Sequence, residues 1–252
     1  MQQQRARLKK IYILPNLFTT ANMFCGFYAI VAAINQNFLT AAWSILIAMI
    51  FDSMDGRVAR LTRATSAFGV EYDSLSDLVS FGMAPALVTY LWCLQPFGRL
   101  GWLAAFLYLA CAALRLARFN VLVDTVPKRY FQGLPSPLAA ATVATAVIFY
   151  HELGLQISKD GYMLGLTLAL GSLMISTIRF PSFKEFKFSR ENSFGILAVG
   201  ILTLVLIAVR PEVTLFVVSG VYIVGGIFWD LHRIIFRRKD PAPVVPTAKT
   251  SH

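Results

Sequence analysis

The segment DSMDGRVARLTRATSAFGVEYDSLSD, residues 52–77, follows an uncharged apolar run, AAWSILIAMIF, at residues 41–51. Four aspartates stand in this segment, at spacings of three and of four residues: Asp52, Asp55, Asp73 and Asp77. Either spacing places the two members of a pair on one face of a helix. Two neighbouring antiparallel helices would therefore bring four carboxylates to a common point at the edge of an apolar layer.

The composition of the whole chain is that of a membrane protein. Its 252 residues are 57% hydrophobic and 14% charged, with a mean hydropathy of +0.63, whereas a soluble domain has about 25% charged residues. Uncharged apolar runs of about 20 residues, the length that crosses a bilayer, recur along the chain. We therefore expect an all-α integral membrane protein, a bundle of about eight transmembrane helices at 14–34, 40–59, 74–95, 101–121, 136–153, 161–178, 194–209 and 212–232.

The basic residues give this layout an orientation. With a cytoplasmic N-terminus, all of the 23 lysines and arginines except Arg99, Lys159 and Arg210 fall on the inner side. This asymmetry follows the positive-inside rule and places both the N- and C-termini in the cytoplasm. The net charge of +10 then reflects short loops beside anionic lipids. No basic, aromatic-rich soluble module is present, so we expect no nucleic-acid partner.

Four carboxylates at a membrane edge require a positive counterpart, because even one costs about 2.5–3.5 kcal/mol near the bilayer centre. Hard divalent cations take oxygen ligands, and Mg²⁺ commonly joins one or two carboxylates to substrate phosphates. Two such ions about 4 Å apart suit phosphoryl chemistry. The alternative is that the aspartates cap helices or pair with Arg57, Arg60 and Arg63. Gly56 and Ala59 leave a surface without bulk, which admits a close diphosphate or tight helix packing.

The pattern D52-x-x-D55-G56-x-x-A59-R60, followed by G69-x-x-x-D73-x-x-x-D77, resembles the signature of the CDP-alcohol phosphotransferase family. The resemblance implies a six-helix core, a homodimer, and two divalent cations, Mg²⁺ or Mn²⁺, at the cytoplasmic edge of the membrane. It also implies transfer of a phosphatidyl group from a CDP-linked lipid to an alcohol, with release of CMP.

Further segments resemble the bacterial members of this family that use serine: PNLFTTANMFCG (15–26), YDSLSDLVSFGMAPA (72–86), RLARFN (115–120) and GLPSP (133–137). The resemblance implies that the substrates are CDP-diacylglycerol and L-serine and that the enzyme lies in the cell membrane among its lipids. It divides the chain into a basic cytoplasmic or interfacial segment (1–13), the family core (14–178), a cytoplasmic loop (179–193), an additional transmembrane hairpin (194–236) and a disordered cytoplasmic tail (237–252).

Carried over by position, the family roles make Asp52, Asp55 and Asp73 the main metal ligands. Asp77 would be a ligand or neighbour of the ions and the general base that accepts the serine hydroxyl proton. The CDP site would be lined by small and polar residues of the signature, with two neighbours from the first helix: Gly56, Ala59, Arg60, Gly69, Asn22 and Thr19.

For the serine carboxylate we expect an arginine fork, which fits a carboxylate better than a lysine does. Arg118, together with Arg115, lies on the side where the aspartates open, and Asn120 and the GLPSP loop would shape the pocket. The alternative for both arginines is that they only anchor the chain at the inner membrane surface.

Two other functions remain open from the sequence. The first is the same chemistry with another acceptor: glycerol 3-phosphate, inositol phosphate or choline. The second is a divalent-cation transporter, since intramembrane carboxylates often mark ion pathways. A transporter would have its charges near mid-membrane on broken helices, whereas these aspartates gather at one edge.

Overall fold

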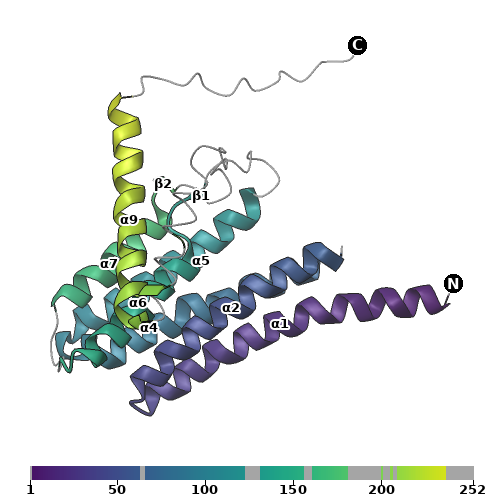
Figure 1. Ribbon diagram of the computed structural model, residues 1–252, viewed down its shortest axis with the longest axis horizontal. Coiled ribbons are helices and arrows are strands. Elements are labelled where there is room, and N and C mark those ends of the chain that lie inside the picture. The colour runs from purple at the N-terminus through teal and green to yellow at the C-terminus, as the bar shows by residue number, and fades with distance from the viewer. Residues whose placement is uncertain are drawn as a thin grey trace.

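A computed structural model gives the fold, and it describes residues 2–62, 66–122, 131–155, 161–180, 200, 205–206 and 209–236. Helices dominate this part of the chain (Figure 1). In order they are α1 (Gln2–Ile34), α2 (Phe38–Thr62), α3 (Ala67–Asp77), α4 (Ala84–Thr89), α5 (Arg99–Leu122), α6 (Ser136–Glu152), α7 (Gly161–Ile175) and α9 (Pro211–Phe236).

Five of the eight predicted spans coincide with segments long and apolar enough to cross a membrane: Pro15–Ile34, Phe38–Thr62, Ala67–Phe97, Arg99–Val121 and Val213–Leu231. The predicted spans at 136–153 and 161–178 are helical too, but α6 and α7 have only 17 and 15 residues. The span predicted at 194–209 and the tail at 237–252 lie largely or wholly outside the described residues, as does most of the loop predicted at 179–193.

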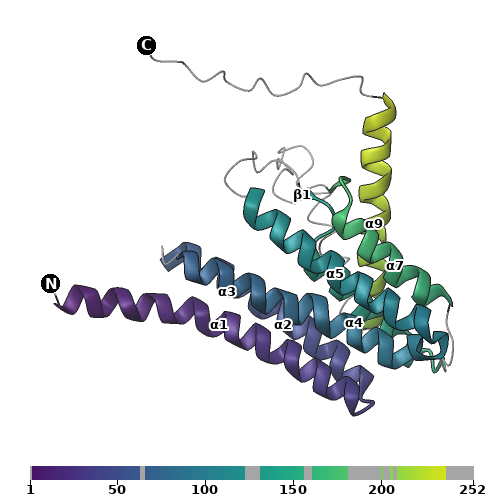
Figure 2. The same cartoon turned by 180° about the vertical axis from the view of Figure 1, so that it is seen from behind.

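Helices α1 and α2 form an antiparallel hairpin and lie side by side in both views (Figures 1 and 2). The amide of Asn37 bonds to the carbonyl of Ala32 and the amide of Gln36 to that of Ala33. This is a Schellman end, which needs one left-handed residue, and Gln36 supplies it with φ = 61°. Buried alanines let the two backbones approach closely: Ala29, Ala32, Ala33, Ala41, Ala42 and Ala48.

The third span is one continuous rod whose winding changes along its length. After α3 it continues as a π-helix, η1 (Leu78–Met83), then as α4, a second π-helix, η2 (Tyr90–Leu94), and a 3₁₀ turn, η3 (Gln95–Phe97). In η1 the amide of Ala84 bonds to the carbonyl of Val79, five residues earlier. Such wide turns are rare and are frequent at functional sites.

Helix α6 is the centre of the bundle. Every residue from Ala139 to Ile148 is buried, which is the pattern of a helix that is apolar all round and surrounded by others. It contacts α2, α4, α7 and α9, while α5 lies against α7 and η1. Figure 2 shows α1, α3, α5 and α7 fanning out in that order, with α9 standing across them.

The predicted all-α fold class is confirmed, and one small strand pair accompanies the helices. Two short strands, β1 (Phe131–Gln132) and β2 (Arg179–Phe180), pair antiparallel, Phe131 with Phe180 and Gln132 with Arg179. Two-residue strands carry no alternating pattern that a sequence could reveal. They tie the segment before α6 to the segment after α7.

Candidate metal and nucleotide site

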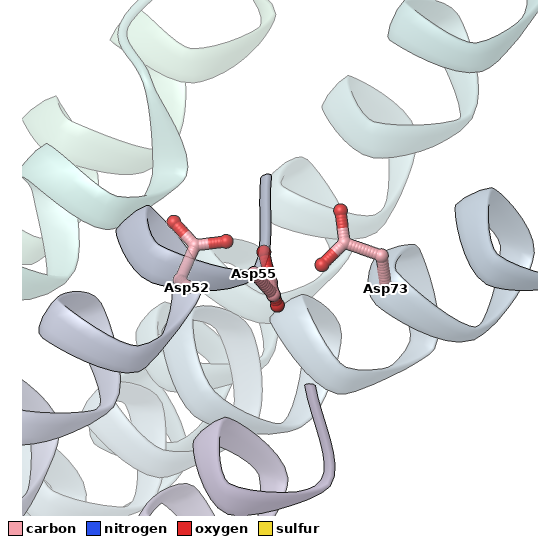
Figure 3. Close-up of side chains that lie close together, drawn as sticks. All are labelled: Asp52, Asp55 and Asp73. Carbon is pink, nitrogen blue, oxygen red and sulfur yellow. The ribbon is translucent and has the colours of Figure 1, made fainter. Parts of the chain in front are cut away.

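Three of the four aspartates converge. Asp52 and Asp55 project from the second half of α2 and Asp73 from α3, and each offers a carboxylate oxygen within 4.8 Å of the others. In Figure 3 the side chains of Asp52 and Asp73 point toward each other across Asp55. Asp55 is only 4% exposed. The helical spacing that the sequence analysis relied on thus brings these carboxylates together as predicted.

The same face of α1 supports both acidic helices. Thr19 Oγ1 donates to Asp55 Oδ2 at 3.1 Å, and Asn22 Nδ2 donates to Asp77 Oδ1 at 3.2 Å. In return, hydroxyls of the third span donate to α1 carbonyls: Ser76 to Thr19 and Ser80 to Asn22, both at 3.0 Å. Four side-chain hydrogen bonds therefore fix α1 to α2 and to the third span at the level of the carboxylates.

Asp77 stands beside the group of three rather than within it. It interacts electrostatically with Asp52 and Asp73 and receives the hydrogen bond from Asn22. The Arg115 guanidinium interacts with both Asp77 and Asp52. Asp77 thus borders both the acidic cluster and the Arg115 guanidinium.

This donor set fits a divalent cation. Asp73 Oδ1 is buried and has no hydrogen-bond partner among the described residues, and an unpaired buried oxygen of this kind costs about 1–3 kcal/mol or more. Three carboxylates with oxygens within 4.8 Å of one another are the hard oxygen donors that Mg²⁺, Mn²⁺ and Ca²⁺ take. A cation there would satisfy the oxygen and offset the mutual repulsion.

A cavity of about 180 Å³ opens next to these carboxylates, with Asp55 and Asp73 in its wall. Its other lining residues include five of the six predicted for the nucleotide: Thr19, Gly56, Ala59, Arg60 and Gly69. The sixth, Asn22, is fully buried, is not part of this lining, and contacts Asp77 instead. A Cβ on Gly56 would lie 3.6 Å from the Arg60 guanidinium, an ordinary van der Waals contact, so a larger residue there would take up space in the cavity wall without a clash.

Two lining residues, Asn16 and Ser66, were not singled out from the sequence. Ser66 is the N-cap of α3, and its Oγ accepts a hydrogen bond from the Gly69 amide at 3.0 Å. Serine is a preferred N-cap residue, so the sequence could have indicated that a helix begins after Ser66. Asn16 lies next to Pro15 on the same wall, but no local pattern marks it.

The three residues predicted for the acceptor lie at the end of α5 but do different things. Arg115 Nη1 donates to the buried Ser136 Oγ at 2.7 Å. Arg118 donates to backbone carbonyls at the end of α7, among them Ile175 O at 3.1 Å. Asn120 is bonded to Ser74 of α3, with 2.9 Å from Nδ2 to Oγ. Arg115 also interacts electrostatically with Asp77 and Asp52.

Comparison with known proteins agrees with this arrangement. The family model described as CDP-alcohol phosphatidyltransferase matches residues 12–178. A CDP-diacylglycerol–serine O-phosphatidyltransferase of Helicobacter pylori (strain J99) is 39% identical over 241 residues, which cover 93% of this chain and 99% of that protein. An enzyme with the same name from Bacillus subtilis is 35% identical, covering 71% of this chain and 94% of its own. An archaetidylserine synthase of Methanothermobacter thermautotrophicus is 36% identical, with coverages of 69% and 72%.

Proposed function

The chain belongs to the CDP-alcohol phosphatidyltransferase family, and we propose that it transfers the phosphatidyl group of CDP-diacylglycerol to the hydroxyl of L-serine, giving phosphatidylserine and CMP. The observation that carries this proposal is the convergence of Asp52, Asp55 and Asp73 beside a cavity that also contains Arg60. Serine as the acceptor is supported by the relatives from Helicobacter pylori and Bacillus subtilis, both CDP-diacylglycerol–serine O-phosphatidyltransferases.

In the proposed mechanism the cavity receives the nucleotide. Gly56 and Ala59 leave room for a flat base and a diphosphate, and the Arg60 guanidinium faces phosphate oxygens, which it suits by geometry and permanent charge. Asp52, Asp55 and Asp73 would hold two divalent cations, Mg²⁺ or Mn²⁺. When bound, such ions neutralise the diphosphate and the charge that grows on the departing CMP.

Asp77 is proposed as the general base. The serine hydroxyl is a weak nucleophile until a positioned group accepts its proton during attack. Asn22 holds one oxygen of Asp77 through Nδ2, and Asp52 lies within hydrogen-bond reach of the same carboxyl group, so two neighbours fix the position of Asp77. Direct attack of the hydroxyl on the lipid-linked phosphorus forms the new P–O bond as the bond to CMP breaks, so no covalent enzyme intermediate is required.

The acceptor site is proposed beside Asp77, where Arg115 lies between that carboxylate and Ser136. A guanidinium in this place would pair with the serine carboxylate. The role of Arg118 and Asn120 in binding the acceptor stays a prediction, since Arg118 donates to a carbonyl at the end of α7 and Asn120 is bonded to Ser74 of α3.

The finer architectural predictions belong to the same proposal. We propose eight spans with both termini in the cytoplasm, the aspartates at the cytoplasmic face of the cell membrane, the domain limits given above, and a homodimer. The five membrane-length helices support a membrane location. Reporter fusions at the two termini and cross-linking in native membranes would test the orientation and the dimer.

One assay tests the function. Purified protein is given CDP-diacylglycerol, Mg²⁺ or Mn²⁺, and one of a panel of labelled alcohols: L-serine, glycerol 3-phosphate, inositol phosphate or choline. We expect equal amounts of CMP and lipid product with serine only, loss of both after chelation, and recovery when metal returns. Full turnover in the chelated sample, or faster turnover with another alcohol, would contradict the proposal.

A further inference from the structure

The guanidinium of Arg118 closes the end of another helix. Its Nη1 donates to Ile175 O at 3.1 Å, and its Nη2 lies 3.4 Å from Met174 O and 3.3 Å from Ser176 O. Helix α7 ends at Ile175. The last four carbonyls of any helix have no partner within that helix, and a cation near them is also favoured by the helix dipole. Arg118 thus caps α7 from α5.

The loop before α6 completes the same cap. The amide of Gly133 donates to Ile178 O at 2.9 Å, and the amide of Leu134 donates to Leu173 O at 3.0 Å. Gly133 has φ = 80°, a conformation that favours glycine. A Cβ there would lie 2.3 Å from Met174 O and 2.9 Å from Arg118 Nη2. The arginine, the glycine and the helix end therefore fit together with no room for a side chain.

This cap determines where Ser136 lies. Ser136 is three residues after Gly133, begins α6, and is fully buried. Its Oγ accepts the 2.7 Å hydrogen bond from Arg115, and Arg115 interacts electrostatically with Asp77 and Asp52. A connected series of contacts thus runs from Arg118 through residues 133–136 to the guanidinium that borders the acidic cluster.

We propose that Arg118 is a positioning residue, which caps α7 and holds the 133–136 loop so that Ser136 aims Arg115 at the acceptor, and that Arg115 is the arginine that contacts the acceptor carboxylate. This inference rests on the proposed function. The sequence assigned binding of the acceptor carboxylate to both arginines, whereas here Arg115 binds it and Arg118 positions Arg115. Without the cap, Arg115 would still bind the acceptor carboxylate but from a displaced position. Catalysis would then slow while acceptor binding remained.

The test compares Arg115→Ala, Arg118→Ala and Arg118→Lys, with L-serine and with L-serine methyl ester, whose carboxylate is masked, as acceptor or as competitor. Arg115→Ala should raise the serine KM at least about 10-fold, as expected for loss of a charge-assisted pair, and abolish the preference for serine over its ester. Arg118→Ala should lower kcat about 10-fold, change the serine KM less than about two-fold, and keep that preference. Arg118→Lys should recover part of kcat, because a lysine still places charge and donors at the carbonyls.

Two further variants keep the test decisive. Arg99→Ala, at the other end of α5 and exposed, is the matched control and should leave both constants unchanged. If Arg118→Ala does not fold, Gly133→Ala disturbs the same cap through its Cβ and should reproduce the lowered kcat with normal serine KM. A selective rise of serine KM in the Arg118 variants, or wild-type constants in Arg118→Ala, would overturn the inference. Failure of the proposed function is distinct, because the wild-type protein would then release no CMP with serine.

Discussion

The two ends of the α1–α2 hairpin each contain a cavity, and we propose the smaller one as the site. At the Gln36 turn, about 380 Å³ is enclosed by neutral and aromatic groups, among them Asn37, Trp92, Tyr150 and His151. At the other end, roughly 25 Å away at 1.5 Å per residue along α1, about 180 Å³ borders Asp55, Asp73 and Arg60.

The difference lies in how completely each end satisfies its own polar groups. At the Gln36 turn, the helix end is closed by backbone hydrogen bonds, and Trp92 packs edge-on against Tyr150 with ring centroids 5.6 Å apart. At the acidic end, oxygens of Asn22 and Asp73 are buried without partners among the described residues, and like charges face one another. The comparison teaches that unsatisfied charge locates this site better than volume does.

The largest effect should come from removing a carboxylate. Replacing Asp52, Asp55 or Asp73 with alanine should lower turnover at least about 10²–10³-fold, the range seen when one group that stabilises a transition state is lost. CMP release by the purified variants measures this, with membrane insertion and monodispersity confirmed alongside. If the Asp73→Ala enzyme were active, unsatisfied charge would no longer distinguish the acidic end of the hairpin from the Gln36 turn.

A smaller loss of turnover is expected at Asn22, which is not an acidic residue but donates a hydrogen bond to the Asp77 carboxylate. Asn22→Ala should lower kcat about 10–100-fold, as mutation of groups that orient ligands commonly does, because Asp77 loses its only described hydrogen bond from a neutral side chain. Asn37→Ala at the opposite end is the matched asparagine control and should be nearly silent. Equal activities of the two variants would show that Asp77 needs no such support.

Stability, rather than turnover, should respond at Gly26. A Cβ there would lie 2.4 Å from Ser80 Oγ and 2.6 Å from Ser80 Cα, so Gly26→Ala must push α1 away from the third span. Overpacking of this kind costs roughly 1–3 kcal/mol, visible as a lower melting temperature in detergent. Gly165→Ala, where a Cβ would meet no atom within 4 Å, should melt like the parent protein, and a shared shift would contradict the close-contact explanation.

The smallest effect should come from the larger cavity. His151→Ala changes its wall but no group near the aspartates, so CMP release should stay within about two-fold of the parent rate, as for an ordinary surface substitution. A loss comparable to that of the carboxylate variants would mean that the two ends act together.

The sequence predicted the acidic cluster because helical spacing alone decides which aspartates share a face. The six residues predicted for the nucleotide came from the family resemblance, and five of the six lie in the wall of the cavity. The partner of Asn22 could not be predicted: Thr19 and Asn22 share one face of α1, but the packing of α2 and α3 decides which carboxylate each one meets.

Arg118 shows a second limit of the sequence. A position-by-position reading puts it beside Arg115, one turn away on α5, and gives both the same task. Its carbonyl partners, 56 to 58 residues further along the chain, reach it only because α7 ends against α5. Long-range capping has no local pattern, and neither do the two-residue strands that accompany it.

The π-helical turns of η1 have a consequence for variation in this protein. An added residue in a helical turn shifts the angular phase of everything that follows, so the faces before and after Leu78–Met83 are set independently. Upstream of η1, Asp73 and Asp77 must point toward the acidic cluster, while downstream of it the fully buried Ala84 and Val88 face the interior. Regular α-helical winding of the same six residues would rotate one half by about 100° relative to the other, so the wide turns allow both faces to hold at once.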